Sequence, residues 1–577
     1  MSIPNDIRTP LCFIEFDNSQ AVTGTTAQQH KVVLIGQMLS DGTAETAKLY
    51  SFNSGDEAGA LWGRGSLMHA MADWFKESNK HTEVMGVALP EAFNNVDKDY
   101  SATVKTDAVD TAPTITIEFK EADLDRSIDE ATAAEESWTV SAGGKTSNLV
   151  SFDKDTGFMV IAGDGDLAIA DLVVDTAMTI GGKEAVPAGV AATGTQTIVG
   201  TSQEDALIYL QVAGVSVSVL ISKESDASAI ASAIAEVVNG DGDLPVTATA
   251  ASGVITYTAK NTGETGNEIK VVCNYYSGQS FPKGITTQNI QLSGGAGNPD
   301  ITYAISAMAD EWFNHIVMPY KDTTNLDVLR DELLERWGPM KMEEGTAYLG
   351  FAGTHAETST FGLGRNDFLY SCMGVNTSPT PAYLWATAYA AAASYELAID
   401  PARPLQTVVM PRLLPPPVSD RWDTNERNLH LYDGIATHKV DDGGNVQIER
   451  EITMYRLNSF GRPDPSYLDL TTPHTLGYIR YATVNRITQK FPRHKLADDG
   501  QEFDPSQAVV TPSIINLELI ALYQELLKQA IVENVDDYKE ALYCERDPND
   551  RNRINVLASP DLVNQFRVFA MTNQFIL

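Results

Sequence analysis

An α/β pattern that stops near residue 97 and resumes near residue 298 constrains the fold of this chain more than any other feature. On both sides of the break, short apolar runs such as "KVVLIG", "EVMGVALP", "HIVMPY" and "GTAYLGFAG" alternate with helix-like stretches such as "LWGRGSLMHAMADWFKES", "DITYAISAMADEW" and "TTNLDVLRDELLERWG". Continuous apolar character is typical of buried parallel strands, which need helical crossovers between them. We therefore expect the two halves to complete one sheet that is interrupted by inserted residues.

The interrupting residues, 97–297, differ in texture from the α/β halves. They contain short runs rich in Val, Ile and Thr, including "TAPTITIEF", "ALIYLQVAGVSVSVLI" and "GVITYTAKNTGETGN", separated by Gly, Asp and Asn turns. One Ala-rich stretch, "DASAIASAIAEVVNG", predicts a helix. The pattern predicts two β-rich modules that divide near residue 190.

Both ends of the chain are apolar and extended. Near the start, "LCFIEFD" is a short β-like stretch between prolines, typical of an arm. Near the end, "PSIINLELIALYQELLKQAIVENV" predicts an amphipathic helix from Pro512, and the chain finishes on "NQFRVFAMTNQFIL". A terminal strand with apolar residues on both faces needs partners for its amides and for its side chains. Its own sheet or another subunit could supply them, and the residues alone leave both open.

These patterns predict a mixed α+β and α/β multidomain protein, with a discontinuous α/β core domain, inserted β-rich domains and extended N- and C-terminal arms. The expected parts, in chain order, are an N-terminal arm (1–20), the first part of the core (21–96), an extra inserted β-rich domain (97–190), a second inserted β-rich domain (191–297), the second part of the core (298–505), and a C-terminal helix and strand (506–577).

Three stretches in the second half carry local predictions. "YLWATAYAAAASYELAI" predicts a helix, ended by Asp400 and Pro401, whose small residues favour burial within the domain over an intersubunit contact. "LLPPPVSD" predicts a stiff extended connector, because proline lacks an amide donor. "NLHLYDGIATHKVDDGGNVQIEREITMY" predicts a hairpin turning at 441–445, with His430 and His438 on separate strand segments.

Charge narrows the range of partners. The chain has 41 Lys and Arg against 77 Asp and Glu, a net charge of -36 and a pI near 4.5. Nucleic acids and anionic membranes attract clustered basic residues, so neither is expected as a partner, and a basic protein suits the chain better. No window approaches the roughly 18 apolar residues of a spanning helix, and the start lacks a secretory pattern. Cysteines without CxxC spacing predict reduced thiols.

Patterns for catalysis, metal binding or cofactor binding are weak. "AGGKTS" at 142–147 has the tail of a phosphate-binding loop, but Thr139 stands where glycine is needed, so a hairpin turn is expected. "DKDTGFMVIAGD" departs from the calcium-loop pattern and predicts a turn between strands. The 9 histidines form no HxxxH or HxH pair, and no GxSxG elbow occurs. The sequence therefore predicts no enzyme, no cofactor and no metal site.

Longer motifs resemble a known family. Residues 366–455 contain "RNDFLYSCMGVNTSPTPAYLWATAYAAAASYELAIDPARPLQTVVMPRLLPPP" and then "NERNLHLYDGIATHKVDDGGNVQIEREITMY". This stretch closely resembles the contractile tail sheath proteins of Mu-like bacteriophages. "KVVLIGQ", "LWGRGSLMHAM", "ASGVITYTAKNTGETGNEI", "LLERWGP" and "PRHKLADDG" fit the same family, so the resemblance covers nearly the whole chain. Residues 98–190 depart from the family pattern.

The resemblance implies a structural protein of the virion tail, assembled in the host cytoplasm. It implies a helical homopolymer that surrounds a tail tube and contracts to drive the tube through the host envelope. The implied partners are further copies of the chain, the tail tube protein, and the baseplate and tail terminator proteins. An acidic β-rich surface adhesion module is the rival interpretation, and a nucleotide-driven motor is the enzymatic one.

The resemblance also implies that subunits are linked by exchanged terminal strands. The N-terminal residues at the matching positions are Leu11, Phe13, Ile14 and Phe16. The C-terminal residues are Phe566, Val568, Phe569, Met571, Phe575, Ile576 and Leu577.

Overall fold

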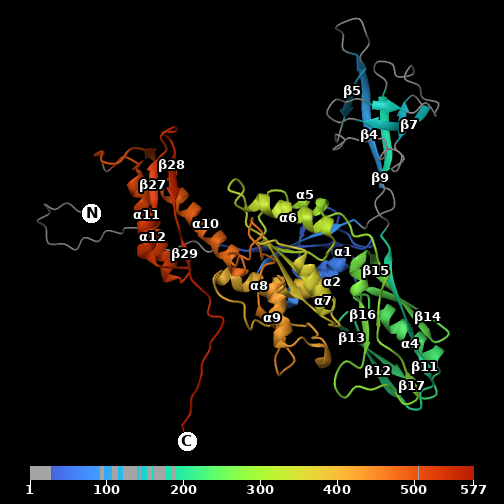
Figure 1. Cartoon of the computed structure of the whole chain (residues 1–577). Coiled ribbons are helices and arrows are strands. Elements are labelled where there is room, and N and C mark those ends of the chain that lie inside the picture. The colour runs from blue at the N-terminus through green and yellow to red at the C-terminus, as the bar shows by residue number, and fades with distance from the viewer. Residues whose placement is uncertain are drawn as a thin grey trace, which may run out of the picture.

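The computed structural model describes residues 28–90, 189–504 and 506–576, with strand segments of the first insert at 96–106, 115–120, 139–142, 145–152, 159–161 and 177–184. The predicted linking residues Leu11, Phe13, Ile14 and Phe16 lie outside the described residues, as does Leu577. Figure 1 shows a central α/β body, a β-rich module beside it, and a separate group of helices built from the C-terminal residues.

A six-stranded sheet forms the centre of the body, in the order β2, β3, β1, β19, β20, β21. Its strands are β1 (Lys31–Gln37), β2 (Leu49–Ser51), β3 (Glu83–Leu89), β19 (His315–Val317), β20 (Thr346–Phe351) and β21 (Tyr370–Gly374). Neighbouring strands are parallel, except that β2 pairs antiparallel with β3. Val33 lies opposite both Met85 and Ile316, so the prediction that the two halves complete one sheet is confirmed.

Helices cover this sheet. α2 and α8 pack on each other and on β1 and β20, whereas α5 packs on β3 with α6 beside it. In Figure 1, α5 and α6 lie above the strands, and α7, α8 and α9 lie below them. The helices are α1 (Gly55–Trp62), α2 (Leu67–Ser78), α5 (Thr302–Met308), which is shorter than predicted, α6 (Thr323–Trp337), α7 (His355–Leu363), α8 (Ala382–Ile399) and α9 (Thr424–Tyr432).

The stretch "LWGRGSLMHAMADWFKES", predicted as a helix after a Gly-rich turn, contains the end of α1, a turn and α2. α1 ends at Trp62, and Gly63 and Gly65 have φ values of +82° and +80°, which glycine adopts without a steric penalty. Ser66 then caps α2, because its side chain accepts a hydrogen bond from the amide of His69. The helix predicted after a Gly-rich turn is therefore α2, which follows the Gly-Arg-Gly segment.

α8 is buried along most of its length. Trp385 and Tyr389 are fully buried, and small residues such as Ala386 face its neighbours. At Gly350 of β20, an added Cβ would lie 2.3 Å from the carbonyl oxygen of Ala382, so glycine allows the helix to approach the strand this closely. The prediction of a helix buried within the domain is confirmed.

The segment before the predicted hairpin turn is helical rather than extended. α9 begins with a capping box, in which the side chains of Asp423 and Glu426 each accept a hydrogen bond from the other residue's backbone amide. His430 therefore lies on a helix, and its assignment to a strand was wrong because the capping residues stand upstream of "NLHLY". The hairpin is confirmed: β22 (Thr437–Val440), which carries His438, pairs antiparallel with β23 (Val446–Arg450).

The described segments of the first insert form a sheet in the order β5, β4, β9, β6, β7, β8. Ala142 pairs with Lys145, so "AGGKTS" lies in a hairpin, as predicted. β7 and β8 are also antiparallel, so the calcium-loop-like stretch begins between paired strands, as expected. The strands are β4 (Val96–Thr106), β5 (Ile115–Lys120), β6 (Thr139–Ala142), β7 (Lys145–Phe152), β8 (Met159–Ile161) and β9 (Ala177–Glu184).

The second insert combines sheets with one Ala-rich helix. α4 (Ala227–Gly240) is capped by Asp226 and packs on β13, β14 and β15, so the predicted helix is confirmed. The sheets have the orders β10-β15-β14, β13-β12-β16-β18 and β11-β17. Their strands are β10 (Ala191–Thr197), β11 (Val199–Gly200), β12 (Ala206–Val212), β13 (Val215–Ile221), β14 (Val246–Ala251), β15 (Val254–Thr262), β16 (Lys270–Cys273), β17 (Ile285–Thr286) and β18 (Ile290–Gln291).

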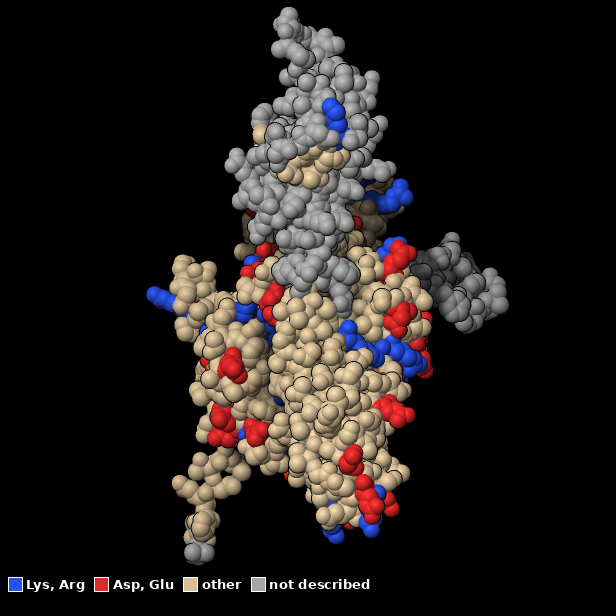
Figure 2. Space-filling view, turned by 90° about the vertical axis from the view of Figure 1, so that its right-hand side faces the viewer, with Lys and Arg blue, Asp and Glu red and all other residues tan. Residues whose placement is uncertain are grey.

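Polar contacts join the second insert to the body. One carboxylate oxygen of Glu268 pairs with Lys321, and the other accepts a hydrogen bond from the amide of Ala382 at 2.8 Å. Lys270 donates to the carbonyl oxygen of Ser378 at 3.0 Å. Figure 2 shows that the side of this insert facing the viewer is mostly uncharged, with acidic and basic residues at its margins. The contacts of Glu268 and Lys270 show that polar groups, largely buried, attach the second insert to the body.

The C-terminal region, 471–576, is a group of helices with short two-stranded sheets. α10 (Thr471–Lys490) and α12 (Val535–Ala541) pack on α11 (Pro512–Lys528), which begins at Pro512 as predicted. The paired strands are β24 (Lys495–Leu496) with β25 (Val509–Val510), β26 (Val532–Glu533) with β29 (Asp561–Leu562), and β27 (Tyr543–Arg546) with β28 (Ile554–Leu557).

Candidate assembly site

The last residues of the chain leave the C-terminal region as an extended tail. From Asn564 to Ile576 the described chain forms neither helix nor strand, and Figure 1 shows it projecting away from the body. The large apolar residues of this tail are between 64% (Met571) and 99% (Ile576) exposed; the others are Phe566, Val568, Phe569 and Phe575. The predicted linking residues that are described thus lie together on one uncovered segment.

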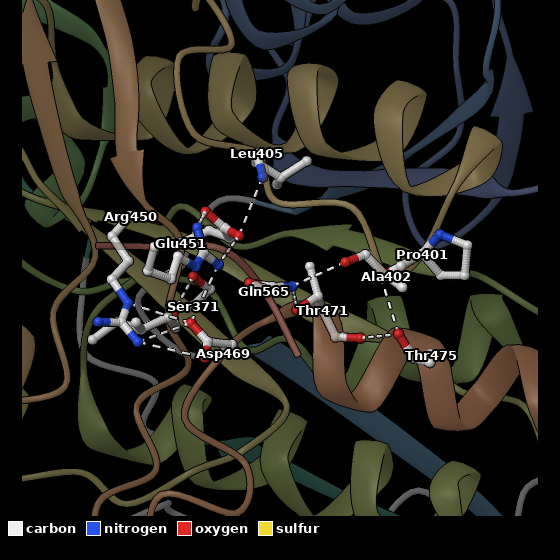
Figure 3. A network of polar contacts seen from close by, with 12 residues as sticks. Ser371, Pro401, Ala402, Leu405, Arg450, Glu451, Asp469, Thr471, Thr475 and Gln565 are labelled. Carbon is white, nitrogen blue, oxygen red and sulfur yellow. Dashed lines mark hydrogen bonds and ion pairs between the residues drawn. The ribbon is translucent and has the colours of Figure 1, made fainter. Parts of the chain in front are cut away.

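The root of the tail contacts the body through Gln565. Its side-chain amide donates to the carbonyl oxygen of Ala402 at 3.1 Å and also to the hydroxyl of Thr471, the first residue of α10. Figure 3 shows Gln565 between Ala402 and Thr471, with Glu451 and Asp469 close by. The tail therefore starts from a position defined by both the body and α10.

Arg567 contributes the charged part of this contact. Its guanidinium pairs with Glu451 and lies 3.3 Å from Asp469. The Glu451 side chain is fully buried, and it also accepts a hydrogen bond from the amide of Leu405 at 3.2 Å. A buried carboxylate is stable only with a close positive partner and satisfied oxygens. Asp469 is shared with Arg450 at 3.2 Å, so the two acids and two arginines form one network.

The C-terminal region also carries open sheet edges. β27 and β28 form a sheet of only two strands, so each has an edge without a strand partner among the described residues. Tyr543, Val556 and Leu557 on these strands are exposed, as is Leu517 on α11. Exposed apolar residues beside an open edge are suited to receive an added strand.

Three histidines meet where the body contacts α10, although they are dispersed in the sequence. His30 Nδ1 and His315 Nε2 lie 2.9 Å apart, and the ring of His474 stacks on that of His315. His315 also contacts the hydroxyl of Tyr348 at 2.9 Å. Burial lowers the pKa of His30 to about 4 and the pKa of His474 to about 3, so both are neutral near pH 7. The spacing in the sequence held no signal for this cluster.

Within the described ranges, no three His, Cys, Asp or Glu side chains are arranged to hold a metal ion. No helix in that part of the chain is both long and apolar enough to cross a membrane. The contacts that the structure does bring together are structural: a tail anchored at its root, exposed beyond it, and open strand edges in the same region.

Comparison with known proteins finds relatives along the whole chain. Residues 294–454 match the phage tail sheath protein central domain, and residues 462–576 match the phage tail sheath C-terminal domain. The tail sheath protein of the Mu-like prophage FluMu of Haemophilus influenzae is 38% identical over 576 residues, which cover 100% of this chain and 99% of that protein.

Solved structures of two sheath tail proteins are also similar. That of Desulfitobacterium hafniense is 11% identical with a TM-score of 0.41, and the match covers 96% of this chain and 100% of the other. That of Listeria innocua is 11% identical with a TM-score of 0.42, and the match covers 94% of each chain.

Proposed function

The chain belongs to the phage tail sheath protein family, and from this membership we propose that its copies polymerise helically around a tail tube and shorten to drive the tube through the host envelope. It is a component of the phage tail, and its homologues are structural proteins rather than enzymes. Helical growth requires head-to-tail contacts between identical subunits, in which one surface of each copy meets a different surface of the next.

The exposed apolar tail is the observation that supports this proposal most directly. A strand added to an open edge of a neighbouring copy satisfies both the main chain and the side chains of the tail. Several main-chain hydrogen bonds at about 0.5–1.5 kcal/mol net, with two or three buried apolar side chains, give on the order of 5–10 kcal/mol per junction before ordering entropy is subtracted. The N-terminal residues Leu11, Phe13, Ile14 and Phe16 would provide a second link of the same kind.

The proposed mechanism of shortening uses stored lattice energy rather than a nucleotide. An extended lattice has the higher free energy, and a baseplate triggers its relaxation to a contracted lattice. The links between subunits hold while rigid bodies move, which fits a packed body joined to its neighbours through a narrow tail. The partners are further copies, the tail tube protein, the baseplate and the tail terminator, and assembly takes place in the host cytoplasm.

Removing residues 568–577 tests strand donation. This deletion keeps Arg567, because losing Arg567 would leave the buried carboxylate of Glu451 without its pairing guanidinium on the tail. We expect a folded monomer with an unchanged melting temperature that no longer forms tubes or rings in negative stain and no longer sediments as a polymer. A collapsed melting temperature would mean that the tail belongs to its own core, and intact tubes would mean that the tail is not the link.

A further inference from the structure

The root of the tail has a fixed alternation of side chains. Gln565 and Arg567 both face their own subunit, where they contact Thr471 and Glu451, whereas Phe566 between them is 77% exposed. In an extended chain, residues two apart point to the same side and the residue between them points to the other. The two contacts therefore fix the rotation of the backbone at 565–567 about its own axis, which we call its phase. In this phase the side chains of Gln565 and Arg567 face their own subunit and that of Phe566 faces away.

We propose that these contacts, which we call the tail clasp (Gln565 and Arg567 on Ala402, Glu451, Asp469 and Thr471), set the face that the donated strand presents to the next copy of the chain. This inference rests on the proposed function. The clasp acts on the register of the strand, and it makes Gln565 and Arg567 positioning residues rather than members of the linking surface.

The clasp is hard to open because it closes over a buried charge. The Glu451 side chain is fully buried and that of Arg567 is 12% exposed, so separating them leaves a carboxylate with little access to water. Arg567 uses both terminal nitrogens on Glu451 and shares one of them with Asp469, at 3.3 Å. A planar guanidinium fixes direction as well as distance, which an ammonium group does not do.

The phase set by the clasp divides the tail into two unlike faces. If the extended chain continues beyond Arg567, the odd-numbered residues Phe569, Met571, Asn573 and Phe575 share the face of Arg567, and the even-numbered residues Val568, Ala570, Thr572, Gln574 and Ile576 share the face of Phe566. The odd face carries the larger apolar side chains. This face packs on the exposed apolar residues beside the open edge of the neighbouring copy.

The clasp also defines the length of the donated strand. The described segment beyond the clasp, 568–576, follows Arg567 directly and spans at most about 30 Å when fully extended, at ~3.3 Å per residue. Phe566 lies within the clasp, so it is too close to its own body to reach across a junction with the rest. The linking surface is therefore shorter than the apolar run in the sequence.

Insertions after Arg567 test the phase. One added threonine shifts every later side chain to the opposite face, and two added threonines restore the original faces. We expect the single insertion to raise the concentration needed for polymerisation by at least about tenfold, and the double insertion to change it by less than about threefold. Sedimentation and negative stain measure both, and monomer melting should be unchanged in each variant.

A second comparison tests the assignment of faces. Phe569→Ala and Phe575→Ala should impair polymerisation more than Val568→Ala and Ile576→Ala. Equal effects of the single and double insertions would overturn the clasp as a register device, even if deleting 568–577 abolishes assembly. If the deletion leaves assembly intact, strand donation itself fails, so the two failures are distinguishable.

Discussion

The body and the C-terminal region differ in the size of their sheets and in how completely their cores are buried. The body has a six-stranded sheet covered by helices, whereas each sheet of the described C-terminal region has two strands. Trp385 and Tyr389 in the body are fully buried, but Ile515 and Leu519 in the C-terminal core keep 7% and 6% exposure. In the body four of the six strands are paired on both sides, whereas every strand of the described C-terminal sheets has an edge without a strand partner among the described residues.

This difference separates stability from assembly. A residue in the body contributes to folding of the monomer, as do Gln565 and Arg567 at the root of the tail, whereas we propose that the tail residues beyond Arg567 contribute when a second copy is present. The small C-terminal core lies between these extremes, since it must fold well enough to present its edges. Substitutions in the three places should therefore fail in three different ways.

The largest effect on monomer stability is expected from Trp385→Ala in α8. The indole is fully buried between helix and sheet, so its loss removes the transfer energy of a large side chain and leaves a cavity, together about 3–5 kcal/mol. Leu522→Ala in α11 is the matched change in the C-terminal core, with an expected loss of about 2–5 kcal/mol. Hydrogen exchange should show the first loss in peptides of α8 and β20.

The second substitution should act locally. Leu522 packs in the C-terminal apolar cluster, so Leu522→Ala should raise exchange in α11 and α12 while leaving α8 protected. Equal exposure of both regions in both variants would show that the body and the C-terminal region unfold as one unit. The body and the C-terminal region would then have the same stability against unfolding, despite the difference in their sheets.

The sequence predicted elements with a strong local pattern in both regions, including α11 from Pro512 in the C-terminal region. Strands β1, β3 and β20 were predictable because buried parallel strands carry continuous apolar runs. The hairpin of β22 and β23 was predictable from its Gly-rich turn. The strand assignment of His430 was wrong, because a local capping box outweighed the apolar pattern.

The polar contacts of the candidate site could not be predicted in this way. The apolar tail residues stood out in the sequence, but Arg567 and Gln565 did not. Arg567 pairs with Glu451, 116 residues away in the chain, and Gln565 bonds to Ala402 and Thr471, 163 and 94 residues away. The meeting of His30, His315 and His474 is likewise a product of the fold. Long-range polar pairs carry no periodic signal, and only the arrangement of the elements brings them together.

An intermediate effect is expected from Glu344→Gln, at the place where the body meets α10. Glu344 lies 2.9 Å from Arg480 of α10, and burial raises the pKa of its carboxyl to about 7. Between the ordinary pKa of 4.5 and this value, the folded chain keeps a proton that the unfolded chain has released. Rising pH therefore destabilises the wild-type fold across this range, and the loss is complete above pH 7.

Glutamine imitates the protonated carboxyl at every pH. Near pH 4.5, Glu344→Gln and the wild type should have the same melting temperature. At pH 8 the variant should melt at a higher temperature, and its unfolding free energy should exceed that of the wild type by about 1–3 kcal/mol. Glu357→Gln is the control of opposite sign, because hydrogen bonds from Thr354 lower the pKa of Glu357, so glutamine there should destabilise at pH 8. A glutamine at 344 that destabilises at pH 8 would mean that the ion pair with Arg480 outweighs burial.

The smallest effect is expected from removing the first insert. Val96 and Glu184 are cross-strand partners on β4 and β9, so these two residues lie side by side. The residues between them can therefore be removed, and a two-residue Asn-Gly turn can connect Val96 to Glu184. Closing a short loop in place of a long one changes the folding free energy little. The proposed assembly contacts lie at the N-terminal residues 11–16, on the tail and in the C-terminal region, all outside residues 96–184. Polymerisation should therefore change by less than about twofold, measured by sedimentation beside the wild type. If the shortened chain melts normally but does not polymerise, the first insert makes a contact between subunits. Assembly would then depend on the first insert as well as on the C-terminal region with its open strand edges.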